Sequence, residues 1–249
     1  MKLYLTPESY IETSKPIDIS LALSNTDENP KAWYVDKPIF EPVRTEHYTG
    51  SIKEGGSVNF RNIFFNPHGH GTHTECLGHI TEEVYSINNT MKEYFFKAQL
   101  LSIKPEKEMN EDGAMDSIIF ADQLTDLESV EALIIRTLPN VDSKKSMDYS
   151  TTNPAYFDSK CAEKLIRTGI DHLLVDLPSV DREKDNGVLA FHHAFWEVPN
   201  NPNFERTISE LVFVENEVED GIYILNFQVA PFENDAAPSR PVLYKIIKA

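Results

Sequence analysis

The feature that most constrains the fold is a pair of short apolar runs separated by one helical segment. The first run, ALIIRT at 132–137, is continuously apolar until its charge, which is the pattern of a buried parallel strand. A helix is expected next, with Asp158 as its N-cap and Gly169 as its stop, followed by a second buried run at 172–177. Because a strand, a helix and a strand in this order form a crossover, the two strands are expected to lie parallel in one sheet.

Other runs of the chain also read as strands. They lie at 17–23, 58–65, 98–103, 211–214, 222–229 and 242–247. The acidic connection PEKEMNEDG at 105–113 is expected to be a solvated loop. No repeat or long linker divides the sequence, so we predict one α/β domain with a mixed β-sheet over residues 1–249.

The charge of the chain limits its partners. Its 249 residues include 40 acidic and 23 basic residues, which gives a net charge of −17. This field repels phosphate backbones and anionic lipid surfaces, so neither nucleic acid nor a membrane is expected as a partner. The N-terminal segment lacks the apolar region of a secretory signal, and the two cysteines suggest no disulfide framework. We expect a soluble, cytoplasmic protein.

Half of the eight histidines fall in one short segment, NPHGHGTHTECLGHI at 66–80. They are His68, His70, His73 and His79. Imidazoles at short spacing around the carboxylate of Glu75 are the ligands that Zn²⁺ or Mn²⁺ requires. The segment matches neither the HExxH motif nor a Cys/His zinc finger, so the sequence points to a different kind of metal site.

Strand alternation sharpens this prediction. In an extended segment, His73, Glu75 and His79 would share one face, whereas His68 and His70 would point to the other. The pattern favours His73 and Glu75 as metal ligands, with His79 beside them. Since two ligands do not hold a metal ion, the rest must come from elsewhere in the chain.

Polar residues that follow the second buried strand can supply the missing ligands. Asp176, Ser179 and Asp181 lie at the end of this strand and just beyond it. They lie at the carboxyl end of a parallel strand, where α/β proteins usually bind ligands. Further on, His192 and Glu210 would complete a four-ligand set with His73 and Glu75, although the adjacent His193 offers the same chemistry as His192.

The order of these motifs resembles the metal-dependent cyclase-family hydrolases, which include bacterial kynurenine formamidases and isatin hydrolases. Their signature, His-x-Gly-Thr-His-x-Asp-x-Pro-x-His, is matched by Gly71-Thr72-His73 and by His79. The resemblance continues over most of the chain, through the segments 18–21, 135–137, 176–181, 192–196 and 235–240, and through Glu210.

The chain departs from the signature at three positions. The first histidine of the family aligns with Gly69, the aspartate with Glu75 and the proline with Leu77. Either His70 or His68 could supply the first metal position through a backbone bend, or that position is absent. The number of ions, one or two, therefore stays open.

The resemblance implies a swivelling β/β/α fold of the kynurenine formamidase type and a homodimer or homotetramer. It also implies an amidohydrolase that cleaves a formamide, a cyclic amide or a related non-peptide C–N bond of a small molecule. The cofactor would be Zn²⁺ or Mn²⁺, and His79 would be the general acid/base. The implied metal ligands are His73, Glu75, His192 and Glu210, with His70 as an additional ligand. Candidates to line the pocket are Trp33, Tyr34, Phe195 and Trp196.

Two alternatives remain at this stage. The Gly69 departure suggests a metal-poor homologue that acts as a small-molecule binding or structural protein. Thiol chemistry at Cys76 is less well supported, because no sequence feature pairs it with a base. We expect Cys161 to belong to the core and His172 to be structural.

Overall fold

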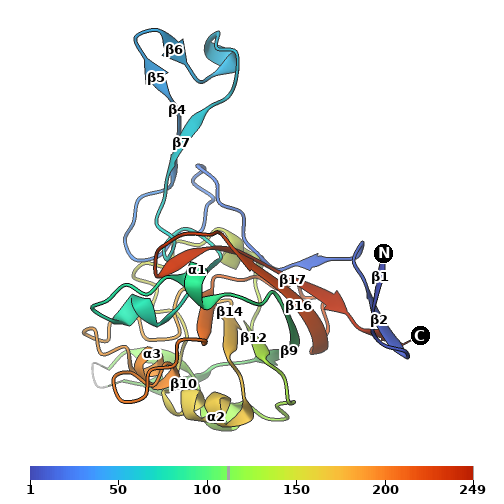
Figure 1. Cartoon of the computed structure of the whole chain (residues 1–249). Helices are drawn as coiled ribbons and strands as arrows, with labels where there is room; N and C mark the ends of the chain where they lie inside the picture. The colour runs from blue at the N-terminus through green and yellow to red at the C-terminus, as the bar shows by residue number, and fades with distance from the viewer. Residues whose placement is uncertain (111–112, 249) are drawn as a thin grey trace.

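A closed mixed β-sheet forms the centre of the computed structural model, which describes residues 1–110 and 113–248 (Figure 1). In their hydrogen-bonded order, its strands are β16 (Gly221–Val229), β9 (Phe95–Ile103), β12 (Ala132–Thr137), β14 (His172–Val175), β15 (Thr207–Glu210), β8 (His73–Glu75) and β17 (Ala236–Lys245). Because β17 also pairs with β16, the sheet closes into a barrel, and β3 (Ile17–Asp18) adds to β17. The predicted mixed α/β class is confirmed.

The predicted crossover is present. Strands β12 and β14 are parallel neighbours, and β9 and β15 continue the parallel part of the sheet on either side. Helix α2 (Lys160–Thr168) connects β12 to β14 and ends at Gly169, whose φ of 81° is left-handed. The N-cap residue is Ser159, one position later than predicted, but the Asp158 carboxylate still accepts a hydrogen bond from the Lys160 amide at 3.0 Å.

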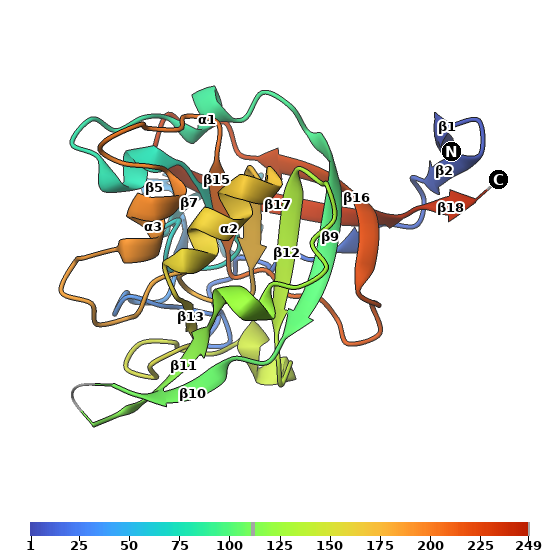
Figure 2. The same cartoon turned by 90° about the horizontal axis from the view of Figure 1, so that it is seen from below.

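Alternate side chains of β12 enter two different hydrophobic clusters. Leu133 and Ile135 pack with α2 and with helix α3 (Ala190–Phe195), on the outer face of the sheet (Figure 2). Ala132 and Ile134 belong to the second cluster, together with side chains of β9, β16 and β17. A strand buried on both faces explains the continuous apolar run in the sequence.

Several residues expected at a pocket or in the core are now placed. Phe195 and Trp196, which were candidates for the pocket, are fully buried in the outer cluster and so belong to the core. Cys161 is buried in the same cluster, as predicted. His172 is buried at the start of β14 and lies 2.8 Å, Nδ1 to Oγ1, from Thr207, which fits its predicted structural role.

Two predicted strands are shorter or displaced. The run at 17–23 forms only β3, followed by an isolated bridge from Ser20 to Val212. The run at 211–214 is not a strand; the strand here is β15, which ends at Glu210. Leu211 has a φ of 54°, and this left-handed conformation breaks the extended chain at that point.

The acidic connection at 105–113 is not only loop. Strand β10 (Glu106–Met109) lies within it and pairs antiparallel with β11 (Met115–Ile119). All four side chains of β10 are exposed, so the prediction that the segment is solvated is correct for them, but the prediction that it is loop is wrong. Residues 111 and 112 lie outside the described part of the chain.

Two structures project from the barrel in Figure 1. The first, which we call the arm, comprises residues 39–64: its stem pairs β4 (Ile39–Pro42) with β7 (Arg61–Phe64), and its tip pairs β5 (Arg44–Thr45) with β6 (Tyr48–Thr49). The predicted strand at 58–65 is thus shortened to β7, which is exposed along its whole length. On another side, β1 (Lys2–Thr6), β2 (Ser9–Glu12) and β18 (Ile247–Lys248) form a small terminal sheet.

Shorter elements complete the fold. They are β13 (Tyr156–Phe157), α1 (Ile87–Thr90) and 3₁₀ turns at Ile52–Glu54, Leu77–Ile80, Ala121–Gln123 and Asp142–Lys145. Within residues 1–110 and 113–248, every helix is too short or too polar to cross a lipid bilayer. A cytoplasmic location stays a prediction from the sequence.

Candidate metal centre and active site

Strand β8 places His73 and Glu75 on one face of the barrel wall. Both side chains are buried, and they are two residues apart, so strand alternation gives them the same direction. The neighbouring strand β15 runs antiparallel and sets Glu210 opposite His73. The Nε2 atom of His73 lies 3.4 Å from Oε2 of Glu210. Its other nitrogen, Nδ1, donates to the carbonyl of Gly71 at 3.0 Å, which fixes the ring.

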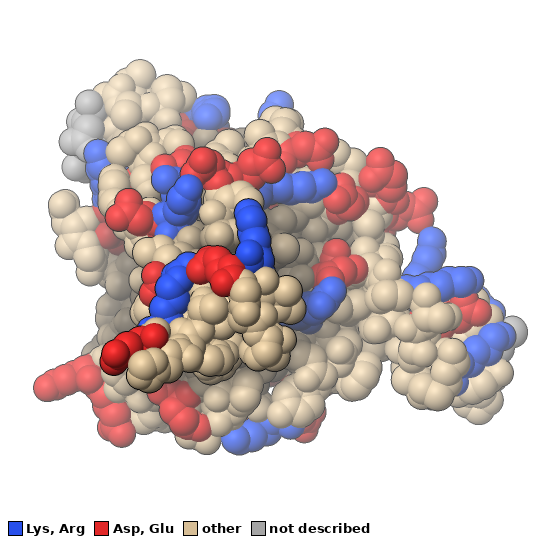
Figure 3. All heavy atoms as spheres, turned by 90° about the horizontal axis from the view of Figure 1, so that it is seen from above, with Lys and Arg blue, Asp and Glu red and all other residues tan. Residues whose placement is uncertain are grey.

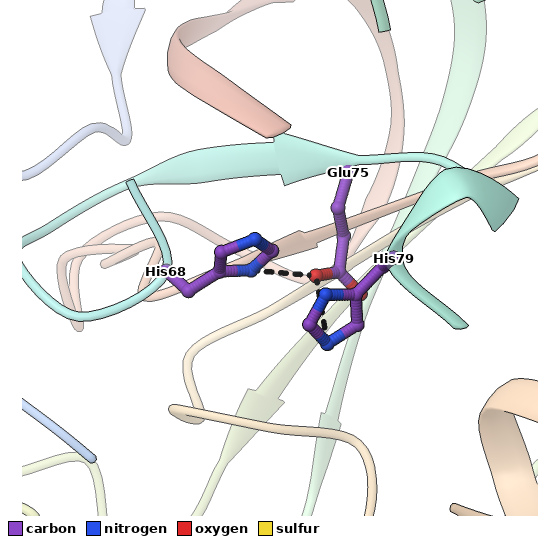
Figure 4. Close-up of side chains that lie close together, drawn as sticks. All are labelled: His68, Glu75 and His79. Carbon is purple, nitrogen blue, oxygen red and sulfur yellow. Dashed lines mark ion pairs between the residues drawn. The ribbon is translucent and has the colours of Figure 1, made fainter. Parts of the chain in front are cut away.

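Glu75 is the hub of the site. Its Oε2 atom lies 3.0 Å from Nδ1 of His68 and 3.8 Å from Nε2 of His79 (Figure 4). Its Oε1 atom lies 3.0 Å from Nε2 of His192, which comes from α3. One buried carboxylate thus faces three imidazoles from three separate parts of the chain.

Asp235 joins the first two of these imidazoles. Its Oδ2 atom lies 2.9 Å from Nε2 of His68 and 3.2 Å from Nδ1 of His79, and the two rings stack with their centroids 4.3 Å apart. The pairing of β17 with β8 sets Ala236 opposite Glu75, so the preceding Asp235 reaches the site. The sequence analysis did not select Asp235 as a site residue; its only signal was membership of the 235–240 segment of the family resemblance.

His192, and not His193, faces the centre. Its Nδ1 atom lies 2.5 Å from Oδ2 of Asp181. Asp181 also accepts hydrogen bonds from the backbone amides of Phe191 and His192, so the carboxylate holds both the start of α3 and the imidazole ring. The His193 ring lies instead near the carbonyl of Val198. Asp181 is a second orienting residue that sequence reasoning placed near the site without a role.

His70 does not reach this cluster. One of its ring nitrogens, Nδ1, accepts a hydrogen bond from the Asn66 amide at 2.7 Å, and the other lies 2.5 Å from the carbonyl oxygen of Asp36. His68 reaches Glu75 instead, because the chain bends between these histidines. A Cβ atom on Gly69 would lie 2.8 Å from a methyl group of Val35, so a side chain at the position that aligns with the first histidine of the family would require Val35 to shift.

The carboxylates control the charge of the histidines. Burial alone would lower the pKa of His68, but Asp235 and Glu75 outweigh it and raise this pKa to about 10. His192 behaves in the same way beside Asp181 and Glu75, with its pKa raised to about 10. Burial opposes the charge of Glu75, but His79, His192 and His68 hold its pKa well below the usual range. The carboxylates and imidazoles of the centre therefore stabilise each other's charges at neutral pH.

The donor atoms of the centre suit a divalent cation. Nε2 of His73 and Oε2 of Glu75 are buried without a hydrogen-bond partner, since the contact from His68 to Glu75 is an ion pair without hydrogen-bond geometry. Ligand atoms of His73, Glu75 and Glu210 lie within 4.8 Å of one another. A second trio, formed by His68, Glu75 and His79, meets the same limit. Imidazole and carboxylate donors of this kind fit Zn²⁺ or Mn²⁺, and Glu75 belongs to both trios.

A cavity of about 300 Å³ opens beside the centre. Its lining includes His68, His79 and His192 from the centre and the side chains of Trp33 and Leu189. Tyr34 is largely exposed and does not line the cavity, but its hydroxyl donates to Glu183 at 2.9 Å. The volume is at the lower end of the range for small-molecule sites.

The closed β-barrel, with its cluster of histidines and carboxylates, defines a fold class that known proteins share. A model of the Cyclase family, described as "Putative cyclase", matches residues 17–182, and the chain belongs to this family. The family resemblance seen in the sequence is thereby confirmed.

Individual relatives agree with this assignment. The chain is 26% identical over 236 residues to a kynurenine formamidase from Bacillus cytotoxicus, with 94% of this chain and 99% of the relative covered. Its fold is similar to that of a protein described as a potential metal-dependent hydrolase with cyclase activity, with a TM-score of 0.65, 15% identity and coverage of 92% and 97%. It is also similar to isatin hydrolase A from Ralstonia solanacearum, with a TM-score of 0.62, 13% identity and coverage of 94% and 92%.

Proposed function

We propose that this protein is a metal-dependent hydrolase of a formamide, a cyclic amide or a related non-peptide C–N bond in a small molecule. The observation that carries the proposal is the position of Glu75, which is shared by two trios of ligand atoms beside a cavity. The kynurenine formamidase and isatin hydrolase relatives support the type of bond.

His73, Glu75, His192 and Glu210 are the proposed metal ligands. All four are nearly or fully buried, and each comes from an element of the barrel wall or from α3. His68 takes the place proposed for the additional ligand, because His70 is engaged with the backbone. When bound, Zn²⁺ or Mn²⁺ would supply Lewis acidity for a water molecule and for the substrate carbonyl.

His79 is the proposed general acid/base. It is the most exposed histidine of the centre, with 31% of its side chain accessible, and it lines the cavity. Asp235 holds its Nδ1 atom, which leaves Nε2 to take a proton from the attacking water. The same atom would return the proton to the nitrogen that leaves when the C–N bond breaks. Asp235 would stabilise the imidazolium between these two steps.

The cavity supports a planar organic substrate. Trp33 and Leu189 provide apolar contact area, whereas the centre provides polar groups on one side. Trp33 has a φ of 61° and its neighbour Tyr34 a φ of 60°, so two consecutive bulky residues are held in the left-handed region. The bond from Tyr34 to Glu183 and that from the Tyr34 amide to Ser150, at 3.0 Å, hold this loop against the cavity.

We also propose that the protein is a homodimer or homotetramer and that the arm mediates the contact between copies. Phe60, Ile63 and Phe64 of the arm are each at least half exposed. A two-stranded ribbon is only marginally stable alone in water, so such a surface favours a partner. Although the chain has a net charge of −17, the arm carries three acidic and three basic residues, which removes the repulsion between copies at this point. Seen from above in Figure 3, the arm points towards the viewer, and basic and acidic side chains there are interspersed with uncharged ones.

The proposed function is tested by metal content and turnover together. We expect one or two equivalents of zinc or manganese by mass spectrometry on tag-free protein, and hydrolysis within a panel of formamides and cyclic amides. The His73→Ala variant should lose both. Protein that takes up no metal after dialysis against Zn²⁺ and Mn²⁺ would contradict the proposal and would favour a metal-poor binding protein.

The role of His79 requires a separate measurement. The His79→Ala variant should keep its metal and lose about 10²-fold or more in kcat, because general acid/base groups contribute roughly 10²–10⁴-fold. Loss of one metal equivalent in this variant would instead make His79 a ligand of the trio with His68 and Glu75.

A further inference from the structure

A second cavity lies at the carboxyl ends of three parallel strands. Its volume is about 380 Å³, and its lining begins where β9, β12 and β14 end, at Lys104, Thr137 and Asp176. Ligands of open α/β sheets usually bind beyond the carboxyl ends of parallel strands. The cavity shares no lining residue with the cavity beside the metal centre.

The charge of this cavity is opposite to that of the chain as a whole. Its lining includes Lys104, Lys107 and Lys144, whereas Asp176 is its only acidic lining residue in the described part of the chain. The Asp176 carboxylate is already neutralised by Lys144, with Nζ and Oδ2 2.8 Å apart. Two cationic side chains, Lys104 and Lys107, therefore remain uncompensated at the cavity in a protein of net charge −17.

Strand β10 contributes its lysine, but neither of its glutamates, to this cavity. Its sequence alternates acid and base, and Lys107 lines the cavity while its neighbours Glu106 and Glu108 do not. The Lys107 ammonium donates to Ser117 Oγ at 2.6 Å, which directs it along the cavity wall and leaves two of its protons for a ligand. Within residues 1–110 and 113–248, Nζ of Lys104 has neither a hydrogen-bond nor an ion-pair partner.

The remaining walls are apolar. They are formed mainly by Leu138, Pro139, Val141, Pro154, Ala155 and Leu177. Leu138 and Val141 are 38% and 44% exposed, which is unusual for large aliphatic side chains next to a hollow. A phosphate group would require several convergent donors, such as arginines or a row of backbone amides, and an apolar wall offers none. An apolar body that carries one carboxylate fits both the walls and the two lysines.

We propose that this cavity is a binding site for a small organic carboxylate with an apolar body, separate from the metal centre. The carboxylate lies between Lys104 and Lys107, and the apolar body packs against Leu138, Val141 and Leu177. The inference is independent of the proposed hydrolase, because no residue of the site belongs to the candidate metal ligands.

The test uses benzoate as the probe on the full chain. Isothermal titration should detect saturable binding of benzoate, and binding of the neutral analogue benzamide and of inorganic phosphate should be at least about tenfold weaker. The double variant Lys104→Gln/Lys107→Gln should weaken benzoate binding about tenfold, since two exposed ion pairs contribute up to about 1 kcal/mol each. The matched control Lys2→Gln/Lys248→Gln changes the net charge equally on the terminal sheet and should bind benzoate as the wild type does.

Two further measurements locate the probe. Methyl NMR should show benzoate-dependent shifts for Leu138 and Val141, and Val141→Glu should weaken binding by repulsion. His73→Ala should bind benzoate as the wild type does. Binding that is lost in His73→Ala would assign the probe to the metal centre and overturn the proposal. Equal binding by benzamide, equal binding by phosphate, or insensitivity to the double lysine substitution would also overturn it.

Discussion

Two buried carboxylates, Asp176 and Glu75, have opposite surroundings. Asp176 accepts hydrogen bonds from the Thr137 amide, the Thr137 hydroxyl and the Lys144 ammonium, at 2.9, 2.9 and 2.8 Å. Its charge is matched by one cation whose three protons all find acceptors. Glu75 faces three histidines, and one of its buried oxygens has no hydrogen-bond partner.

This difference in hydrogen bonding indicates that Asp176 is a structural carboxylate and Glu75 a functional one. A buried charge that is fully paired and hydrogen-bonded holds its neighbours in place. A buried carboxylate with one unbonded oxygen, on the same strand as a histidine whose Nε2 is also unbonded, is arranged to bind a cation. Burial alone would not distinguish the two residues, since each is only 1% exposed.

Substitution at Glu75 should give the largest functional effect and little loss of stability. We expect Glu75→Gln to lose bound metal and to lower kcat/KM by roughly 10³-fold or more, because metal catalysis contributes several kcal/mol of transition-state stabilisation. Its melting temperature, measured after treatment with a chelator, should fall less than that of the Asp176→Asn variant, because His68 and His192 keep Asp235 and Asp181 as partners. The exposed Glu219→Gln variant is the matched control. Unchanged metal content in Glu75→Gln would contradict the assignment.

Substitution of Asp176 is expected to lower stability and to leave metal binding unchanged. The Asp176→Asn variant should lose about 3–5 kcal/mol in the free energy of unfolding, because it leaves the largely buried ammonium of Lys144 without its counter-ion. Denaturant unfolding measures this loss, and mass spectrometry of the folded fraction should show unchanged metal content. Loss of metal with unchanged stability in this variant would instead make Asp176 a functional residue and would contradict the proposed difference between Asp176 and Glu75.

The buried histidines also divide into a structural residue and residues of the metal centre, and their pKa values differ accordingly. Burial lowers the pKa of His172 to about 4, whereas carboxylates raise the pKa of His68 and His192 to about 10. As the pH falls below 6.5, His172 becomes protonated in the unfolded chain before it does so in the native protein. The free energy of unfolding therefore falls until about pH 4.

The expected loss from His172 over this interval is about 3 kcal/mol, since one pKa unit corresponds to about 1.4 kcal/mol. The measurement is the free energy of unfolding at a series of pH values for the wild type, for His172→Phe and for the exposed control His47→Gln. His172→Phe should lose this part of the pH dependence. An identical pH profile for the wild type and His172→Phe would show that His172 is not held neutral.

The smallest effect on the barrel is expected from the arm. Phe60→Ser with Ile63→Ser should shift the protein towards monomers, by about tenfold or more in the dissociation constant, because burial of each side chain contributes about 1.5 kcal/mol or more. Light scattering after size exclusion measures the change. The melting temperature of the monomer should stay within a few degrees of that of the wild type. A Glu46→Ser control tests charge on the same arm, and an unchanged mass in the double variant would exclude the arm as the interface.

Local sequence patterns determined the elements whose residues are neighbours along the chain. Strand β12 has the predicted bounds 132–137, because a run buried on both faces requires apolar residues at every position. The stop of α2 at Gly169 followed from the conformational freedom of glycine. The shared direction of His73 and Glu75 is likewise a local property, since alternation along an extended chain fixes it.

Local patterns failed where distant segments decide the outcome. The run at 211–214 looked like a strand, but the left-handed Leu211 moves the strand to β15. The run at 58–65 was predicted to be a strand, and the part of it that forms β7 lies in the exposed arm. The alternation of apolar and polar residues in this run is consistent with one strand of a ribbon. It does not predict which surface the ribbon contacts.

The sequence by itself determined the chemistry of the centre, histidines around one glutamate, and the parallel pairing of β12 with β14 in the sheet. Only the tertiary structure decided that His68 and not His70 reaches Glu75, because both ring nitrogens of His70 have backbone partners, at Asn66 and Asp36. It also decided that Asp235 orients His68 and His79, from a position 156 residues beyond His79. The physical reason is that periodicity specifies the face of an element, whereas the pairing of strands that are distant in sequence, such as β8 with β17, specifies which residues meet.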